Sequence, residues 1–154
     1  MVVKFNIIRF FLPTLLAFSV LQSHGQDKNK SLAGKVVRVM DGDTVAVLVD
    51  NSEVKIRLYG IDAPESKQAF GTRSKQALSE MVFGNVVRVE VTDTDRYGRS
   101  IGKIYYNNQY VNLGMVQKGM AWVYRQYTSD PDLLKAEEQA KAGKVGLWVD
   151  KEPM

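Results

Sequence analysis

The chain has 154 residues, of which 45% are hydrophobic and 25% are charged, and its formal net charge is +4. These values are typical of one globular domain and exclude a disordered chain, a collagen-like fibre and a protein with several membrane-spanning helices. The sequence has no cysteine and a single histidine, His24, which excludes zinc sites of the cysteine/histidine type, cysteine nucleophiles and a lipid-modified cysteine.

The first 25 residues have the pattern of a secretory signal peptide. Lys4 and Arg9 precede the apolar run 10–21, and the small residues Ser23 and Gly25 occupy positions −3 and −1 of a cleavage site after Gly25. This run is shorter than the roughly 20 residues that a membrane-spanning helix needs, so a retained anchor is the alternative interpretation. We therefore expect a secreted or periplasmic protein without stable membrane association.

Cleavage after Gly25 leaves 129 of the 154 residues and removes the only histidine together with two of the basic residues, so the net charge falls from +4 to +2. Attraction to a polyanion must then come from local clusters of charge and not from the overall field. An exported domain without disulfides must be stabilised by its core, which is feasible at this length. The predicted organisation is a signal peptide over 1–25, a flexible polar segment over 26–34 and a folded domain over 35–154.

Three strands are predicted at the start of the folded domain, over 35–40, 44–50 and 53–59. The turns between them are Asp41-Gly42-Asp43 and Asn51-Ser52. In the second and third strands apolar residues alternate with polar ones, which indicates that one face is buried. The three strands are expected to form an antiparallel meander.

A helix is expected over 70–82, where apolar residues recur at helical spacing, and strands follow over 86–91 and 99–106. Asn107-Asn108 is typical of a hairpin turn, here into a short extension at 110–111.

Two further helices complete the chain. The first is predicted over 112–119, with Asn112 as its N-terminal cap and Gly119 at its end. The last helix begins after a capping Asp130, has Pro131 at its first position and ends at Gly143. Five strands with a helix between the third and the fourth match the order of a small OB-type barrel. The predicted fold is therefore of the α+β class, a five-stranded OB-type β-barrel with about three helices.

Acidic residues gather in the predicted loops. DGDT contains Asp43, IDAPE contains Asp62 and Glu65, and TDTDRYGR contains Asp93 and Asp95. Because 44–59 is one up-and-down hairpin, the loops at its two ends lie at the same edge of the sheet, which places Asp43 beside Asp62. Neighbouring carboxylates repel each other, so a divalent cation with oxygen ligands, Ca²⁺ or Mg²⁺, is expected between them. Each loop taken alone is also consistent with an ordinary turn.

Basic and aromatic residues complement these acids. Arg57 and Arg99 carry planar, permanently charged groups that suit bidentate contact with phosphate, and Glu65 could orient a water molecule for attack on phosphorus. Tyr97 and Tyr127 could stack on bases. The alternatives are surface ion pairs for the arginines and packing for the tyrosines.

Five segments in this order resemble the thermonuclease, or staphylococcal nuclease-like, family: VMDGDTVAVLVD, IRLYGIDAPE, DRYGRSIGKIY, VNLGMVQKGMAWVY and AEEQAKAGKVGLW. The resemblance extends from about Lys35 to Trp148. It implies an OB-type barrel that hydrolyses phosphodiester bonds of DNA and RNA with Ca²⁺ as cofactor. It also implies in-line attack by water, departure of the 5′-oxygen and 3′-phosphorylated products.

The resemblance also implies residue roles. Asp43 and Asp62 match side-chain calcium ligands, and Ala63 matches a residue that binds calcium through its backbone carbonyl. Glu65 matches the carboxylate that acts as general base or orients water. Arg57 and Arg99 match two phosphate-binding arginines.

The chain departs from the family pattern at several positions. Ala63 replaces a threonine, and the segment after Glu65 is shorter than the family's lysine-bearing loop. We expect Arg96, Tyr97, Arg125 and Tyr127 to contact the substrate. Arg96 replaces a lysine of the family pattern, and Arg125 replaces a second tyrosine.

The sequence therefore predicts an exported, calcium-dependent, sugar non-specific endonuclease that prefers single-stranded or breathing DNA and RNA and acts as a monomer. The alternative is a non-catalytic OB-fold module that only binds nucleic acid. A binding module has no use for Asp43, Asp62 and Glu65 beside a phosphate, since uncompensated negative charge weakens binding.

Overall fold

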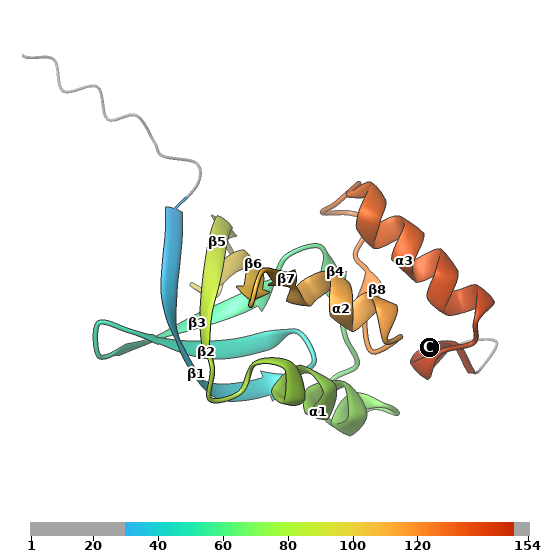
Figure 1. Ribbon diagram of the computed structural model, residues 1–154, viewed down its shortest axis with the longest axis horizontal. Coiled ribbons are helices and arrows are strands. Elements are labelled where there is room, and N and C mark those ends of the chain that lie inside the picture. The colour runs from blue at the N-terminus through green and yellow to red at the C-terminus, as the bar shows by residue number, and fades with distance from the viewer. Residues whose placement is uncertain (1–29, 150–154) are drawn as a thin grey trace, which may run out of the picture.

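The computed structural model describes residues 30–149, in which five strands close a β-barrel (Figure 1). The strands are β1 (Lys30–Asp41), β2 (Thr44–Val49), β3 (Ser52–Leu58), β5 (Val86–Thr94) and β6 (Ser100–Tyr106). β1, β2 and β3 form an antiparallel meander, β1 also pairs with β5, β5 pairs with β6, and a parallel pairing of β3 with β6 closes the barrel. The predicted five-stranded OB-type barrel is confirmed. The predicted signal peptide lies outside the described residues.

Shorter strands and three helices surround the barrel. β7 (Gln109–Tyr110) extends the sheet at β6, and β4 (Ile61–Asp62) pairs with β8 (Trp122–Val123). The helices are α1 (Gly71–Val82), α2 (Val111–Gln117) and α3 (Pro131–Ala142), and the 3₁₀ helix η1 (Gly146–Val149) follows. Figure 1 shows α1 at one end of the barrel and α2 between the barrel and α3. Within residues 30–149, no helix is long and apolar enough to cross a membrane.

The N-terminal strand begins earlier than predicted. Residues Lys30 to Lys35 pair one to one with residues Val91 to Val86 of β5, so the prediction of a flexible segment is wrong from Lys30 onward. The polar side chains of Lys30 and Ser31 gave no sign of a strand in the sequence. In the structure these side chains are exposed, while the backbone of both residues pairs with β5. Residues 26–29 lie outside the described part of the chain.

Asn112 has a different role from the predicted helix cap. α2 starts one residue earlier, with Tyr110 in the capping position, and the Asn112 side chain is fully buried. Its oxygen accepts from the backbone N–H of Ile104 at 3.0 Å, and its amide donates to the carbonyls of Tyr59 at 3.0 Å and Gly102 at 3.2 Å. Asn112 therefore joins α2, β6 and the end of β3 by satisfying buried backbone groups.

Helix α3 is built as predicted and carries a buried acid. Asp130 caps it by accepting from the N–H of Asp132 at 3.0 Å, and Pro131 occupies its first turn. Glu137, only 2% exposed, accepts from the backbone N–H of Val123 at 2.9 Å and from Arg125 at 2.6 Å. Lys141 also donates to Glu137, at 3.0 Å. This network fixes β8 against α3.

Replacing Glu137 with alanine is expected to lower the free energy of unfolding by about 2–3 kcal/mol, because the buried N–H of Val123 loses its acceptor. Chemical denaturation measures this change. Glu138→Ala is the matched control, since Glu138 is exposed on the same helix and should change stability by less than about 0.5 kcal/mol. Equal stability of the two variants would contradict the structural role of Glu137.

Candidate active site

Three segments enclose a cleft of about 600 Å³ on one side of the barrel. They are the end of β3 with the start of β4, the loop that joins β5 to β6, and the chain that follows β8. The polar and aromatic residues that line the cleft are Arg57, Tyr59, Thr92, Asp93, Thr94, Asp95, Arg96, Tyr97, Arg99, Tyr124 and Tyr127. Three of the four predicted substrate-contacting residues, Arg96, Tyr97 and Tyr127, therefore share one cleft with both predicted phosphate-binding arginines. The fold brings the three segments together.

Arg57 links the two predicted metal-binding acids. It faces Thr44 across the β2–β3 ladder, so its side chain extends toward the turn that precedes β2. Its guanidinium donates to Asp62 Oδ1 at 2.7 Å and lies 3.3 Å from Asp43 Oδ2. It also donates to the carbonyl of Ile61 at 2.8 Å. The predicted proximity of Asp43 and Asp62 is therefore observed, with Arg57 between them.

A close approach at Gly42 sets the position of Asp43. A Cβ atom at residue 42 would lie 1.8 Å from Ser74 Oγ and 2.8 Å from the Ala63 Cβ, so only glycine fits between α1 and the loop after β4. The next residue, Asp43, accepts from the Ala63 N–H at 2.9 Å and from the Thr44 hydroxyl at 2.8 Å. The turn of DGDT is thereby docked on the loop of IDAPE.

Asp43 is 5% exposed, and this burial raises the pKa of its carboxyl to about 7 against the opposing effect of Arg57. A carboxylate in such a place is stabilised in its ionised form by a neighbouring cation. Among the described residues no group of three or more acidic or histidine side chains could hold a metal ion, so a bound cation would need carbonyl and water oxygens besides Asp43 and Asp62. Calcium accepts that mixture of oxygen ligands, so the donor set of Asp43, Asp62 and the Ala63 carbonyl fits it.

Arg99 is held by an acid of its own loop. Asp95 Oδ2 accepts from Arg99 Nε at 2.6 Å, while Oδ1 accepts from the backbone N–H groups of Tyr97 at 2.9 Å and Arg99 at 3.0 Å. Loss of solvent raises the pKa of Asp95, but the hydrogen bonds from Arg99 and Tyr97 outweigh it, and the net effect is a lowered pKa. Because Asp95 uses only Nε, both terminal nitrogens of Arg99 stay available for a phosphate.

Replacing Asp95 with alanine is expected to lower kcat/KM for a phosphodiester substrate by about 10-fold, because Arg99 loses the partner that orients it. Asp95→Asn should recover part of this loss, since its amide oxygen can still accept from the loop. Glu138→Ala is the control, because Glu138 is an exposed acid on α3 that does not line the cleft. If Asp95→Ala and Glu138→Ala had the same kinetics, Asp95 would not position Arg99.

Aromatic side chains form the outer wall of the cleft. Tyr97 is 69% exposed, and the Arg96 guanidinium lies over its ring at 4.8 Å from the centroid. Tyr127 is 64% exposed and packs edge-on against Tyr124, with 4.7 Å between the ring centroids. Sequence reasoning missed Tyr124, which enters the cleft because its N–H donates to the Gly60 carbonyl at 2.9 Å.

Besides the three predicted metal ligands, two predicted site residues lie outside the lining of this cleft. Arg125 pairs with Glu137 of α3 and is not among the residues that line the cleft. Glu65 is exposed in the loop between β4 and α1, where its N–H donates to Gln68 Oε1 at 2.6 Å. No hydrogen bond from residues 30–149 reaches the Glu65 carboxylate, which leaves it free to bind water.

Comparison with known proteins identifies the family. The model of the staphylococcal nuclease homologue family matches residues 55–150. A protein of Haemophilus influenzae named "Uncharacterized endonuclease" is 45% identical over 141 residues, which cover 91% of this chain and 78% of that protein. The protein named "Micrococcal nuclease" in Shigella flexneri is 44% identical over 128 residues, covering 76% and 74% of the two chains. "Protein ParB" of Escherichia coli is 48% identical over 130 residues, covering 77% and 73%. The chain therefore belongs to the staphylococcal nuclease homologue family.

Proposed function

We propose that the protein is an endonuclease that hydrolyses phosphodiester bonds of DNA and RNA with calcium as cofactor. The observation that carries the proposal is the placement of Arg57 and Arg99 in one cleft directly beside the Asp43–Asp62 pair. Two relatives bear the printed names of nucleases, which supports this activity for the family.

The residues of the cleft and of the adjoining loops account for each requirement of the reaction. Arg57 and Arg99 bind the scissile phosphate and stabilise the negative charge that develops on its oxygens. Glu65 orients the attacking water or accepts its proton, and the bond to the 5′-oxygen breaks as water attacks in line. Calcium, when held by Asp43, Asp62 and the Ala63 carbonyl, supplies positive charge next to the phosphate.

The substrate is a flexible single strand or a breathing duplex. Tyr97, Tyr124 and Tyr127 offer ring faces that any base can stack on, and stacking is tolerant of sequence and of the sugar. Within the described residues, no helix contributes to the lining of the cleft, so the cleft has no recognition helix that could read a groove. We therefore propose little base selectivity.

The activity is tested by incubating the chain from Gln26 to Met154 with denatured DNA and with RNA, in calcium, in magnesium and in chelator. Cleavage of both polymers in calcium, its loss in chelator and 3′-phosphate ends are expected. Binding without any cleavage would overturn the proposal in favour of the non-catalytic OB-fold module.

Export is proposed on the signal-peptide pattern of residues 1–25. The N-terminus of the protein recovered outside the cytoplasm is expected to be Gln26, and intact-mass spectrometry measures it. Recovery of the full 154-residue chain in the membrane fraction would instead show that the apolar run is retained as an anchor.

A further inference from the structure

A series of cationic and aromatic side chains lies on the outer face of β5, β6 and β7. Arg88, Tyr105 and Tyr110 are direct cross-strand partners on these three strands, so their side chains share one face of the sheet. The Arg88 guanidinium lies 4.3 Å from the Tyr105 ring centroid. The rings of Tyr105 and Tyr110 stack with 5.3 Å between centroids and 23° between planes.

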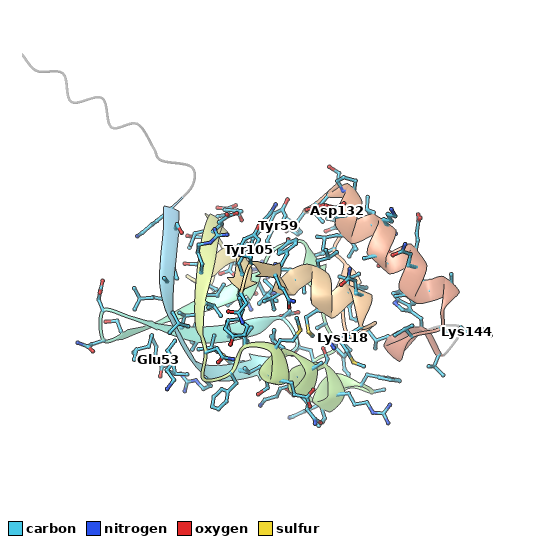
Figure 2. All side chains as sticks on the ribbon, in the orientation of Figure 1. Glu53, Tyr59, Tyr105, Lys118, Asp132 and Lys144 are labelled. Atoms are coloured by element: carbon cyan, nitrogen blue, oxygen red, sulfur yellow. The ribbon has the colours of Figure 1, made fainter. Side chains whose placement is uncertain are left out.

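Lys103 connects this row to the cleft. It lies two residues before Tyr105 on β6 and therefore faces the same side. Its ammonium group is 5.8 Å from the Tyr110 ring centroid and 5.4 Å from that of Tyr59. Tyr59 also lines the cleft that contains Arg57 and Arg99. The side chains of Tyr59 and Tyr105 are labelled in Figure 2. We name the series Arg88–Tyr105–Tyr110–Lys103–Tyr59 the aromatic ladder.

Two acids hold the ladder in place, and its side chains are unequally exposed: Arg88 is exposed, whereas the three rings are half-buried and the Tyr110 hydroxyl is buried. Glu90 accepts from Arg88 at 2.6 Å and from the Tyr105 hydroxyl at 3.4 Å, and Asp130 lies 3.8 Å from Lys103. These two acids balance the two cations, so the ladder has little net charge. The side chain of Arg88 is 48% exposed and that of Lys103 is 30% exposed. Arg88 and Tyr110 lie against the Tyr105 ring, so the outer side of the Arg88 guanidinium and the edges of the rings are the parts of this surface that a base can contact. The two acids make the surface less suited to collect phosphates.

We infer that the aromatic ladder is a second binding surface for single-stranded nucleic acid, which carries the strand as it leaves the cleft past Tyr59. This inference rests on the proposed nuclease function. A polynucleotide longer than the cleft must cross the adjoining surface, and Tyr59 belongs both to the cleft lining and to the ladder. Aromatic rings interleaved with cationic side chains bind single strands by stacking, and an arginine plane can stack on a base as a ring does.

The test compares substrates that do and do not reach the ladder. We measure kcat/KM in calcium for a trinucleotide and for an oligothymidine of about 20 nucleotides, which exceeds the length that one OB-fold contacts. The wild-type protein is expected to prefer the long substrate through a lower KM. In Arg88→Ala/Tyr105→Ala this preference should fall by about 10-fold.

Two further variants separate stacking from stability and charge. Tyr105→Phe keeps the ring and should retain the preference of the wild type. Arg38→Ala is the matched control, because Arg38 is an exposed arginine paired with Glu53 elsewhere on the barrel, and no aromatic contact of Arg38 exists among the described residues. Arg38→Ala should leave the preference unchanged.

The outcomes distinguish this inference from the proposed function. Cleavage with an unchanged length preference in Arg88→Ala/Tyr105→Ala overturns the ladder alone. Absence of cleavage in the wild-type protein overturns the proposed function, and the ladder is then judged by fluorescence anisotropy with the long oligonucleotide in chelator. Equal affinity of the wild-type protein and the double variant, or no binding by either, overturns the ladder. The ladder inference is also overturned if the wild-type protein sediments as a dimer and the double variant as a monomer while both bind the oligonucleotide with equal affinity. That result assigns the surface to a second copy of the chain.

Discussion

Replacing Arg99 with alanine is expected to lower kcat for phosphodiester cleavage by at least about 100-fold while the protein stays folded. The reason is that Arg99 lines the cleft and offers a planar pair of nitrogens to a phosphate, while Asp95 fixes only its Nε. Loss of a single group that stabilises developing charge in other enzymes costs about 100- to 1000-fold in kcat. Steady-state kinetics with denatured DNA in calcium measure the change.

The stability of the Arg99→Ala variant should change little. The ion pair with Asp95 is the main contact that is lost, and the Arg99 side chain is 30% exposed, so the expected loss is about 1 kcal/mol or less. Arg99→Lys keeps the charge without the planar pair of donors and should recover only part of the activity. Arg38→Ala removes an exposed arginine outside the cleft and should keep full activity. An Arg99→Ala protein with wild-type kcat would show that the phosphate binds elsewhere.

Replacing Asp43 with asparagine is expected to abolish calcium-dependent stabilisation and to lower cleavage by at least about 100-fold. Asp43 is the most buried acid at the proposed calcium site, at 5% exposed, and its charge is the strongest attraction that the site can offer a cation. A ligand present at 100 times its dissociation constant stabilises the native state by about 2.7 kcal/mol. For a domain of this length, the wild-type Tm should rise by roughly 8–10 °C in saturating calcium.

The asparagine variant separates metal binding from folding. Its side-chain oxygen can still accept from the Ala63 N–H, and a neutral amide is less costly to bury than a carboxylate, so its Tm in chelator should not fall below that of the wild type. Adding calcium should then leave its Tm unchanged. Asp50→Asn is the matched control, because Asp50 is an exposed turn residue at the other end of the β2–β3 hairpin. A full calcium shift in Asp43→Asn would place the metal elsewhere.

The strands and the proximity of the two acids could be predicted because both depend on local information. Alternation of apolar residues in 44–58 predicts a hairpin. A hairpin brings the residues just before its first strand close to those just after its second strand, independently of the rest of the fold. Asp43 and Asp62 therefore meet on either side of Arg57 as expected. The cap of α3 at Asp130 is local in the same sense and was also predicted.

Residue types with two common roles were assigned less well. An asparagine near the start of a helix is typical of a cap, yet Asn112 is buried and bonds to the carbonyl of Tyr59, 53 residues away. Lys30 and Ser31 have the composition of a flexible tail, yet they form a strand because β5 presents them with a backbone partner. Arg125 lies next to Tyr124 in the chain but pairs with Glu137.

The sequence by itself determined the barrel, the family resemblance and the set of charged residues from which the active site is proposed, because periodicity, turn residues and short motifs act over a few neighbouring positions. Only the tertiary structure decided that Tyr124 enters the cleft, that Asp95 holds Arg99 by Nε, and that the aromatic ladder continues from Tyr59. Whether a side chain faces solvent, a cleft or a buried backbone group depends on which distant strand packs beside it. That pairing is set by burial summed over the whole core and not by the residue or its neighbours in the chain.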